Sequence, residues 1–170
     1  SSSSEIIDFI MDDSSLFLRF KYGNIVRVEC VKHSDILSIS SNENNLKKSI
    51  IKVPQTVAKI SQMIKYEKSD GEKCLLALSD MDQILAFSIE KGSLINRNYI
   101  GCQELICGCF LKEFKVFVLS TKTEMVLVDS DDLSVVKRTD RSYVTCFFYE
   151  KSKSSLFVGM AVSSALNCRL

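Results

Sequence analysis

Short apolar segments recur in pairs along the chain, and the spacing within each pair is constant. The first segment of each pair opens at Leu16, Leu75, Val116 or Leu156, and the second opens nine residues later, at Ile25, Ile84, Met125 or Ala165. Short polar links separate the two members of every pair. Segments of about five residues joined by tight turns are typical of β-hairpins. The pattern therefore predicts four hairpins that repeat one structural unit.

Further strand candidates flank these hairpins. One precedes each hairpin, at residues 6–11, 57–66, 105–111 and 144–149, and one follows each of the first three, at residues 36–39, 94–99 and 133–136. The polar residues 41–48 are expected to form an exposed loop insertion. The count predicts three complete four-stranded units and a fourth that stops in its third strand. Unit starts at 6, 57, 105 and 144 bracket the period of roughly 40–50 residues found in propeller blades.

A helical alternative exists for uniformly apolar segments such as residues 105–111, because periodicity alone does not separate a buried strand from a buried helix. The runs are short, rich in Val, Ile, Phe and Tyr, and interrupted by turn residues, which favours strands. Aromatic residues follow one another along one predicted strand, at Tyr143, Phe147, Phe148 and Tyr149. This spacing suggests a strand that is buried on both faces. We therefore expect an all-β, β-propeller-like array of four-stranded antiparallel blades.

The domain organisation follows from the same count. Residues 1–4 are interpreted as a linker or an expression remnant, and residues 5–170 as a single propeller-like domain. Its blades are expected at about residues 5–40, 56–100, 104–138 and 143–170. Propellers close with about four to eight blades, so this domain is expected to be part of a larger propeller. Alternatively, a protein partner completes it by strand addition, or the array remains an open curved stack.

Composition narrows the class of protein. The 22 basic residues nearly balance the 21 acidic residues, for a formal net charge of +1, which argues against a broad basic face for nucleic acid or membrane. No apolar run approaches the roughly 18–20 residues that span a bilayer, and no secretory signal is visible. The seven cysteines are odd in number and lie mostly in apolar segments. Free thiols of this kind predict an intracellular protein, cytoplasmic or nuclear.

Several segments carry a family resemblance. Met125–Asp129 ends an apolar strand with Asp, residues 84–89 are followed by Glu90-Lys91-Gly92, and Asp80 and Asp82 occupy the turn before that strand. In these respects the chain resembles the WD40-like β-propeller repeat family over nearly all of residues 5–170. The chain has no Trp and one His, so the resemblance is to the blade pattern and not to the Trp-Asp and Gly-His signatures. It implies a propeller that works as an interaction scaffold.

Candidate chemistry is sparse. Cys102, Cys107 and Cys109 lack a fourth ligand and the usual spacing of zinc ligands; we interpret Cys107 and Cys109 as core thiols on one strand face, in phase with Leu105 and Leu111. The acidic run at Asp129, Asp131 and Asp132 lacks the glycine and the final Glu of a calcium loop. His33 has no nucleophile elbow to serve. We therefore expect no catalytic site, cofactor, metal or small-molecule substrate, and no enzyme activity.

Two basic groups remain as candidate contacts with a protein partner or with RNA. They are Lys47, Lys48 and Lys52 beside the longest loop, and Lys137, Arg138 and Arg141 after the third unit. The function predicted from the sequence is a non-catalytic protein–protein interaction scaffold within an intracellular multiprotein complex. The alternative is an RNA-associated scaffold, in a ribonucleoprotein or in a ribosome or RNA-processing assembly, that uses the basic loops.

Overall fold

The computed structural model of the protein is all-β. It describes residues 6–12, 15–20, 25–29, 47–54, 60–79, 82–102, 105–140, 144–160 and 165–169. Over these ranges the chain forms four separate antiparallel sheets and one short 3-10 turn at Lys151–Lys153. No helix among the described residues is long and apolar enough to cross a membrane.

The order of strands within each sheet follows the order of the chain. Sheet 1 contains β1 (Ile6–Asp12), β2 (Ser15–Phe20), β3 (Ile25–Glu29) and β4 (Lys48–Ile51). Sheet 2 contains β5 (Ile60–Glu67), β6 (Lys73–Ser79), β7 (Gln83–Ser88) and β8 (Leu94–Tyr99). Sheet 3 contains β9 (Leu105–Leu111), β10 (Val116–Thr121), β11 (Met125–Asp129) and β12 (Val135–Thr139). Sheet 4 contains β13 (Val144–Glu150), β14 (Ser155–Met160) and β15 (Ala165–Arg169).

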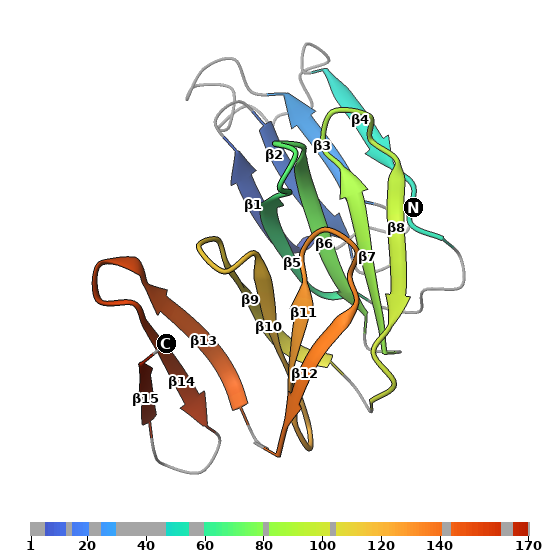
Figure 1. Cartoon of the computed structure of the whole chain (residues 1–170). Coiled ribbons are helices and arrows are strands. Elements are labelled where there is room, and N and C mark those ends of the chain that lie inside the picture. Colours follow the sequence, from blue (N-terminus) through green and yellow to red (C-terminus); the bar gives the residue numbers. More distant parts are fainter. Residues whose placement is uncertain are drawn as a thin grey trace.

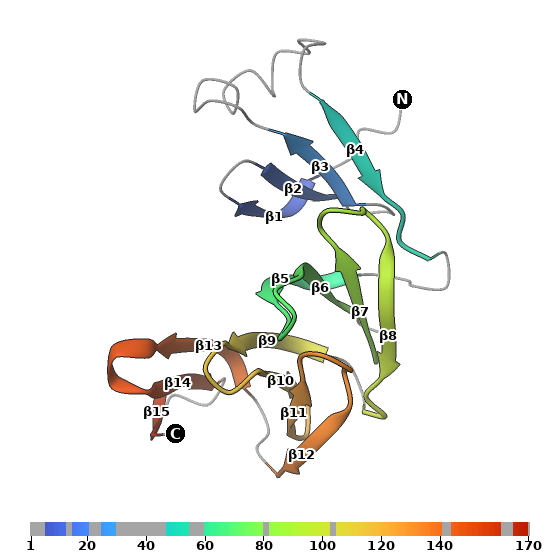
Figure 2. The same ribbon diagram turned by 45° about the horizontal axis from the view of Figure 1, so that its top comes forward.

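The four sheets follow one another along an arc (Figures 1 and 2). Neighbouring sheets meet through their first strands: β1 contacts β5, β5 contacts β9, and β9 contacts β13. Sheet 1 lies at one end of the arc and sheet 4 at the other in both views. Each sheet is thus a local meander that packs face to face on the sheets next to it in sequence.

Three apolar cores fill the spaces between consecutive sheets. Phe17 and Leu75 belong to the core between sheets 1 and 2, and Tyr66 and Phe117 belong to the core between sheets 2 and 3. A third core joins sheets 3 and 4 and contains Leu111, Val118, Leu156 and Val158. Strands β6 and β7 are buried along nearly their whole length, as expected for a sheet that is covered on both faces. Apolar burial on both faces therefore explains why these runs do not alternate with polar residues.

The expected all-β class, the four hairpins and the three-stranded fourth unit are confirmed, but the fourth strand of sheet 1 differs from the expectation. The structure uses β4, in which Ile50 and Ile51 pair with Val26 and Ile25 of β3. Sheet 1 therefore extends beyond the predicted boundary at residue 40, and Lys48 begins a strand instead of ending a loop. Ile51 is fully buried in the core between sheets 1 and 2, which explains why these residues form the fourth strand. The predicted strand at residues 36–39 lies outside the described residues.

Every first strand carries a β-bulge after its first residue. The pairing skips one residue between Ile6 and Asp8, Ile60 and Gln62, Leu105 and Cys107, and Val144 and Cys146. A bulge of this kind turns the residue before it to the opposite face of the sheet. For this reason Leu105 packs between sheets 2 and 3, whereas Cys107, Cys109 and Leu111 pack between sheets 3 and 4. The expectation that Leu105 lies in phase with Cys107 is wrong.

Candidate interaction surfaces

The bulges allow positions in the four sheets to be compared, because residues at the same distance from the bulge are structurally equivalent. The residue before the bulge faces the preceding sheet. It is buried in sheets 2, 3 and 4, where Ile60, Leu105 and Val144 are 5%, 1% and 1% exposed. The equivalent Ile6 in sheet 1 is 49% exposed. Sheet 1 thus exposes a position that the other sheets bury against a neighbour.

The rest of β1 shows the same contrast. Ile10 packs toward sheet 2, so the alternation of a strand places Phe9 and Met11 on the face that points away from sheet 2. Phe9 is 62% and Met11 50% exposed, whereas Met63, the equivalent of Phe9 in sheet 2, is 4% exposed. We call the exposed side chains Ile6, Ile7, Phe9 and Met11 the open face of sheet 1. The exposure is concentrated along β1, since Leu16 and Leu18 on β2 are buried.

The opposite end of the arc has a second uncovered surface, on the face of sheet 4 that points away from sheet 3. Phe148 is 64% exposed there and lies 6.1 Å, between ring centroids, from Phe157 on the neighbouring strand. The equivalents of Phe148 in sheets 2 and 3 are Ile64 and Cys109, which are partly buried against the following sheet. We call Cys146, Phe148 and Phe157 the open face of sheet 4. The prediction that this strand is buried on both faces is wrong, because only one face of sheet 4 contacts another described sheet.

The predicted basic contact residues lie on the outer strands of two different sheets. Lys47 forms an ion pair with Glu29 at 3.2 Å, and Lys48 and Lys52 are exposed within and just after β4.

The second predicted group lies on β12. Lys137 and Arg138 are exposed there, far from β4 in Figure 1. Arg138 pairs with Glu124 and donates to the carbonyl of Ile100, so its guanidinium joins sheet 3 to the end of sheet 2. Arg141 lies outside the described residues. The structure does not bring the two basic groups together.

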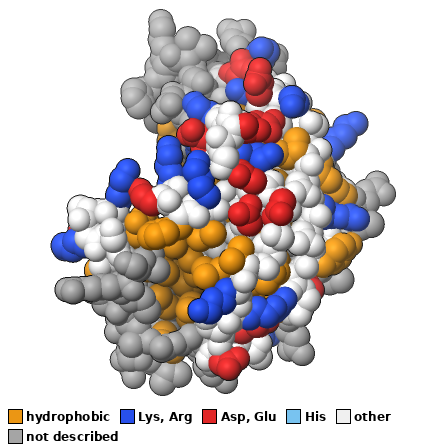
Figure 3. Space-filling model, viewed as in Figure 1, with side chains coloured by type: hydrophobic (Ala, Val, Ile, Leu, Met, Phe, Trp, Pro, Cys, Tyr) orange, Lys and Arg blue, Asp and Glu red, His pale blue; other side chains and the backbone are white. Residues whose placement is uncertain are grey.

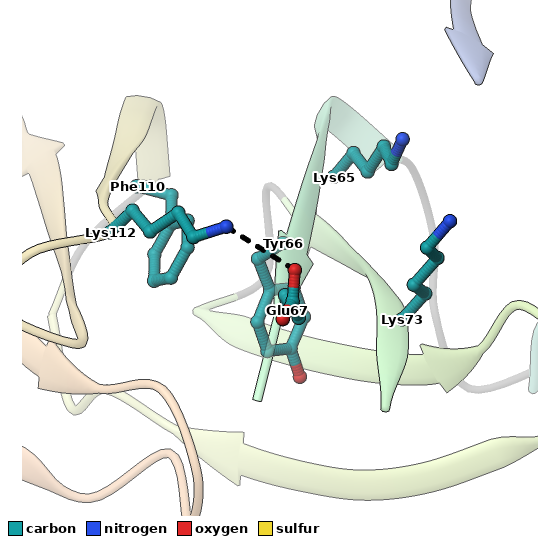
Figure 4. A pocket seen from close by; sticks show the side chains of 6 residues that line it. All are labelled: Lys65, Tyr66, Glu67, Lys73, Phe110 and Lys112. Atoms are coloured by element: carbon teal, nitrogen blue, oxygen red, sulfur yellow. Dashed lines mark hydrogen bonds and ion pairs between the residues drawn. The ribbon is translucent and has the colours of Figure 1, made fainter. Parts of the chain in front are cut away.

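A recess that the sequence reasoning missed lies at the junction of sheets 2 and 3 (Figure 4). It has a volume of about 360 Å³ and is lined by Lys65, Tyr66, Glu67, Lys73, Phe110 and Lys112. Its lysines are dispersed over β5, the start of β6 and the residue after β9. The only signal in the sequence is that basic residues recur where strands meet their turns.

The acidic residues in the turns bind backbone N–H groups. Asp129 accepts hydrogen bonds from the backbone N–H groups of Asp131 and Asp132 at 2.8 and 3.3 Å, which is a turn cap. Asp82 accepts from the N–H groups of Gly101 and Cys102 at 2.9 and 3.0 Å and so holds the connection from sheet 2 to sheet 3.

Free thiols are found at Cys74, Cys102, Cys107, Cys109 and Cys146. Burial and the adjacent carboxylate of Asp82 raise the pKa of the Cys102 thiol to about 12, and burial raises the pKa of Cys109 to about 12. Thiols of this kind are protonated at neutral pH and are poor nucleophiles. Among the described residues, no group of three or more His, Cys, Asp or Glu is placed to hold a metal ion. His33 lies outside these residues.

Comparison with known proteins identifies the fold and no family. No family model matches the chain, and no curated protein matches it. Among solved structures, 507 chains match, a breadth that prevents the fold from assigning a function. One of them is the crystal structure of the computationally designed Ika4 protein, which is 9% identical in sequence and superposes with a TM-score of 0.71 over 100% of this chain and 94% of that chain. The whole chain is therefore similar in fold to this designed protein.

Proposed function

We propose that the protein is a non-catalytic protein–protein interaction scaffold of the β-propeller type, with WD40-like blades, that works inside the cell within a multiprotein complex. The observation that carries this proposal is the contrast between equivalent positions. Ile6 and Phe9 are exposed where Ile60 and Met63 are buried. Exposed apolar surface of this extent on a folded domain is typical of a docking site.

The repeated packing between sheets indicates the occupant of these faces. Sheets 2, 3 and 4 each bury, fully or partly, the equivalents of Ile6 and Phe9 by packing on the sheet before them. Sheets 1, 2 and 3 likewise cover the equivalents of Phe148 by packing on the sheet after them. A twisted antiparallel β-sheet of a protein partner fits both ends, because it continues an interface that the fold already forms three times.

The edge of sheet 4 offers a second mode of contact with the same kind of partner. Strand β15 pairs with β14, and within the described residues sheet 4 has no strand in the place that β12 occupies beside β11. An extended segment of the partner can add there as a fourth strand, through backbone hydrogen bonds. The proposal therefore names protein backbone and apolar side chains, and not a nucleic acid, as the main contacts.

Site-specific photo-cross-linking in the cells that produce the protein tests this proposal. A photoreactive amino acid replaces Phe9, Phe148 or, as a matched control, Val136, which is 59% exposed on β12 away from both open faces. We expect a defined protein adduct from positions 9 and 148, lost at position 9 when Ile6 and Met11 are changed to Ser and at position 148 when Phe157 is changed to Ser, and little adduct from position 136. Equal adducts from all three positions would contradict the proposal, and adducts that are mainly RNA would support the RNA-associated alternative.

A further inference from the structure

The recess at the junction of sheets 2 and 3 is built from strands that belong to neither end of the arc. Figure 4 shows Phe110 and Lys112 on one side of Tyr66 and Glu67, and Lys65 and Lys73 on the other side. The recess is therefore a surface distinct from the open faces of sheets 1 and 4. Its volume of about 360 Å³ lies at the lower end of the range for ligand pockets, roughly 300–1,000 Å³. This space suits one or two side chains of a peptide.

The base of the recess is held in place by aromatic packing. The Tyr66 ring makes edge contacts with Phe110 and Phe117, at 5.7 and 4.8 Å between ring centroids. Phe110 lies 5.1 Å from Phe117. Tyr66 is 3% exposed and Phe117 is fully buried. Because these rings are locked by packing, the recess is formed before a ligand arrives, which lowers the entropic cost of binding.

The charges around this base are predominantly positive. Three ammonium groups, of Lys65, Lys73 and Lys112, line the recess together with one carboxylate, that of Glu67. Glu67 and Lys112 form an exposed ion pair at 3.3 Å. Figure 3 shows Lys and Arg side chains above a hydrophobic patch on this face, with Asp and Glu side chains next to them. The lining therefore carries an excess of positive charge next to a partly exposed aromatic ring, Phe110.

We propose that this recess binds an acidic peptide segment in which carboxylates flank an apolar side chain. The apolar side chain packs against Phe110, and the carboxylates contact Lys73 on one side and Lys112 on the other. Charge-assisted hydrogen bonds from lysine to carboxylate supply orientation and specificity. Each such contact is weak at an exposed site, so binding depends on the combination of charge and apolar contact and weakens as salt is added.

The local distribution of charge favours a peptide over a nucleic acid. A polyphosphate backbone needs a continuous basic track, whereas Glu67 lines the recess itself. Acidic side chains also lie at the turn between β5 and β6: Asp131 accepts a hydrogen bond from the backbone N–H of Ser69 at 2.9 Å, and Glu72 pairs with Lys91 at 3.5 Å. The positive charge is therefore confined to a small area that matches a short acidic segment.

The test is fluorescence anisotropy with the whole chain and a labelled peptide of repeating Glu-Phe-Glu-Gly. A peptide of the same length with Gln in place of Glu, and labelled oligouridylate, are the competing probes. We expect salt-sensitive binding of the Glu peptide and much weaker binding of the other two. The variant K73E/K112E should lower the affinity about tenfold, and K73Q/K112Q, which removes charge without reversing it, should lower it less.

The matched control is K151E/K153E, which makes the same change in net charge at exposed lysines of the 3-10 turn between β13 and β14. Circular dichroism establishes that each variant is folded, and the exposed positions of Lys73 and Lys112 make this the expected result. Equal loss of binding in the control would overturn the proposal, because it would show a general charge effect. Tighter binding of oligouridylate than of the Glu peptide would also overturn it. The open faces are unchanged in these variants, so the result is separate from the test of the scaffold function.

Discussion

The side-chain amide of Gln62 hydrogen-bonds both backbone groups of Gly108 in the next sheet. Its Nε2 donates to the carbonyl of Gly108 at 3.2 Å, and its Oε1 accepts from the N–H of Gly108 at 2.7 Å. Gly108 is buried, and buried backbone groups without partners are costly. One side chain of sheet 2 thus satisfies the backbone of sheet 3 at the point where the two sheets approach closely.

Replacing Gln62 with Leu should lower the free energy of unfolding by about 1–3 kcal/mol, because it leaves two buried backbone groups of Gly108 without their partner. Equilibrium unfolding in urea measures this loss. The matched control is N96A. It removes an exposed hydrogen bond between the same two sheets, from the side-chain amide of Asn96 to the carbonyl of Asp132. A loss from Q62L that is no larger than that from N96A would contradict the role assigned to Gln62.

Gly108 is also required for space. A Cβ at this position would lie 2.6 Å from Cδ2 of Leu119 and 3.2 Å from the Cδ1 atoms of Ile64 and Leu78. G108A should therefore cost about 1–3 kcal/mol through overpacking. L119A alone should cost about 2–5 kcal/mol through the cavity that it leaves. In the double variant G108A/L119A the new methyl group enters that cavity. We therefore expect the loss of stability in the double variant to be clearly smaller than the sum of the losses in the two single variants. Simple additivity would show that the contact with Leu119 does not cause the cost of G108A.

Truncation of two phenylalanines should change stability to very different extents. Phe148 is 64% exposed and Phe117 is fully buried. F148S should change the free energy of unfolding by no more than about 0.5 kcal/mol, whereas F117A should lower it by about 3–5 kcal/mol. Thermal unfolding followed by circular dichroism compares the two variants. A large loss in F148S would mean that the open face of sheet 4 is covered within the chain.

The thiols predict a dependence of stability on high pH. Burial raises the pKa of Cys102 and Cys109 to about 12, from an ordinary value of 9.0. Above about pH 9 the unfolded chain loses these protons while the folded chain retains them, so the free energy of unfolding should fall as the pH rises toward 12. Urea unfolding across this range measures the effect, and variants with Ala at both positions should show a smaller decline.

Alkylation gives a residue-level measurement of the same property. With iodoacetamide at about pH 8, the peptide containing the exposed Cys146 should be modified before those containing Cys102 and Cys109. Rapid modification of Cys109 in the native protein would contradict its burial. Modification of all three at similar rates in urea is the control for intrinsic reactivity.

The sequence predicts the hairpins well because each depends on a local pattern. The nine-residue spacing between Leu75 and Ile84 reflects a single hairpin, β6 and β7, whose register the structure shows directly. The fourth strand of sheet 1 was missed because its four residues, Lys48–Ile51, contain only two apolar side chains. Their pairing with β3 is decided by the three-dimensional position of Ile51 and not by local periodicity.

The interaction surfaces were less accessible to sequence reasoning. An apolar residue such as Phe148 has the pattern of a buried strand, and its exposure follows from the absence of a further sheet over it among the described residues. The recess brings Glu67 and Lys112 together although they are separated by 45 positions. The bulges determine on which face of the sheet Leu105 and Val144 lie, and no distinctive residue type in the sequence marks them. Long-range packing and backbone irregularity are thus the missing information.

Within the described residues, each sheet is formed by consecutive strands of the chain and makes its main contacts with the sheets next to it. Such an arrangement behaves as a linear row of coupled units, in which each interior unit is held from two sides and each terminal unit from one. Opening fluctuations should begin at the ends of the row and spread inward, so amide hydrogens in β6 and β10 exchange last. A ligand that covers a terminal sheet would then slow exchange across the whole row.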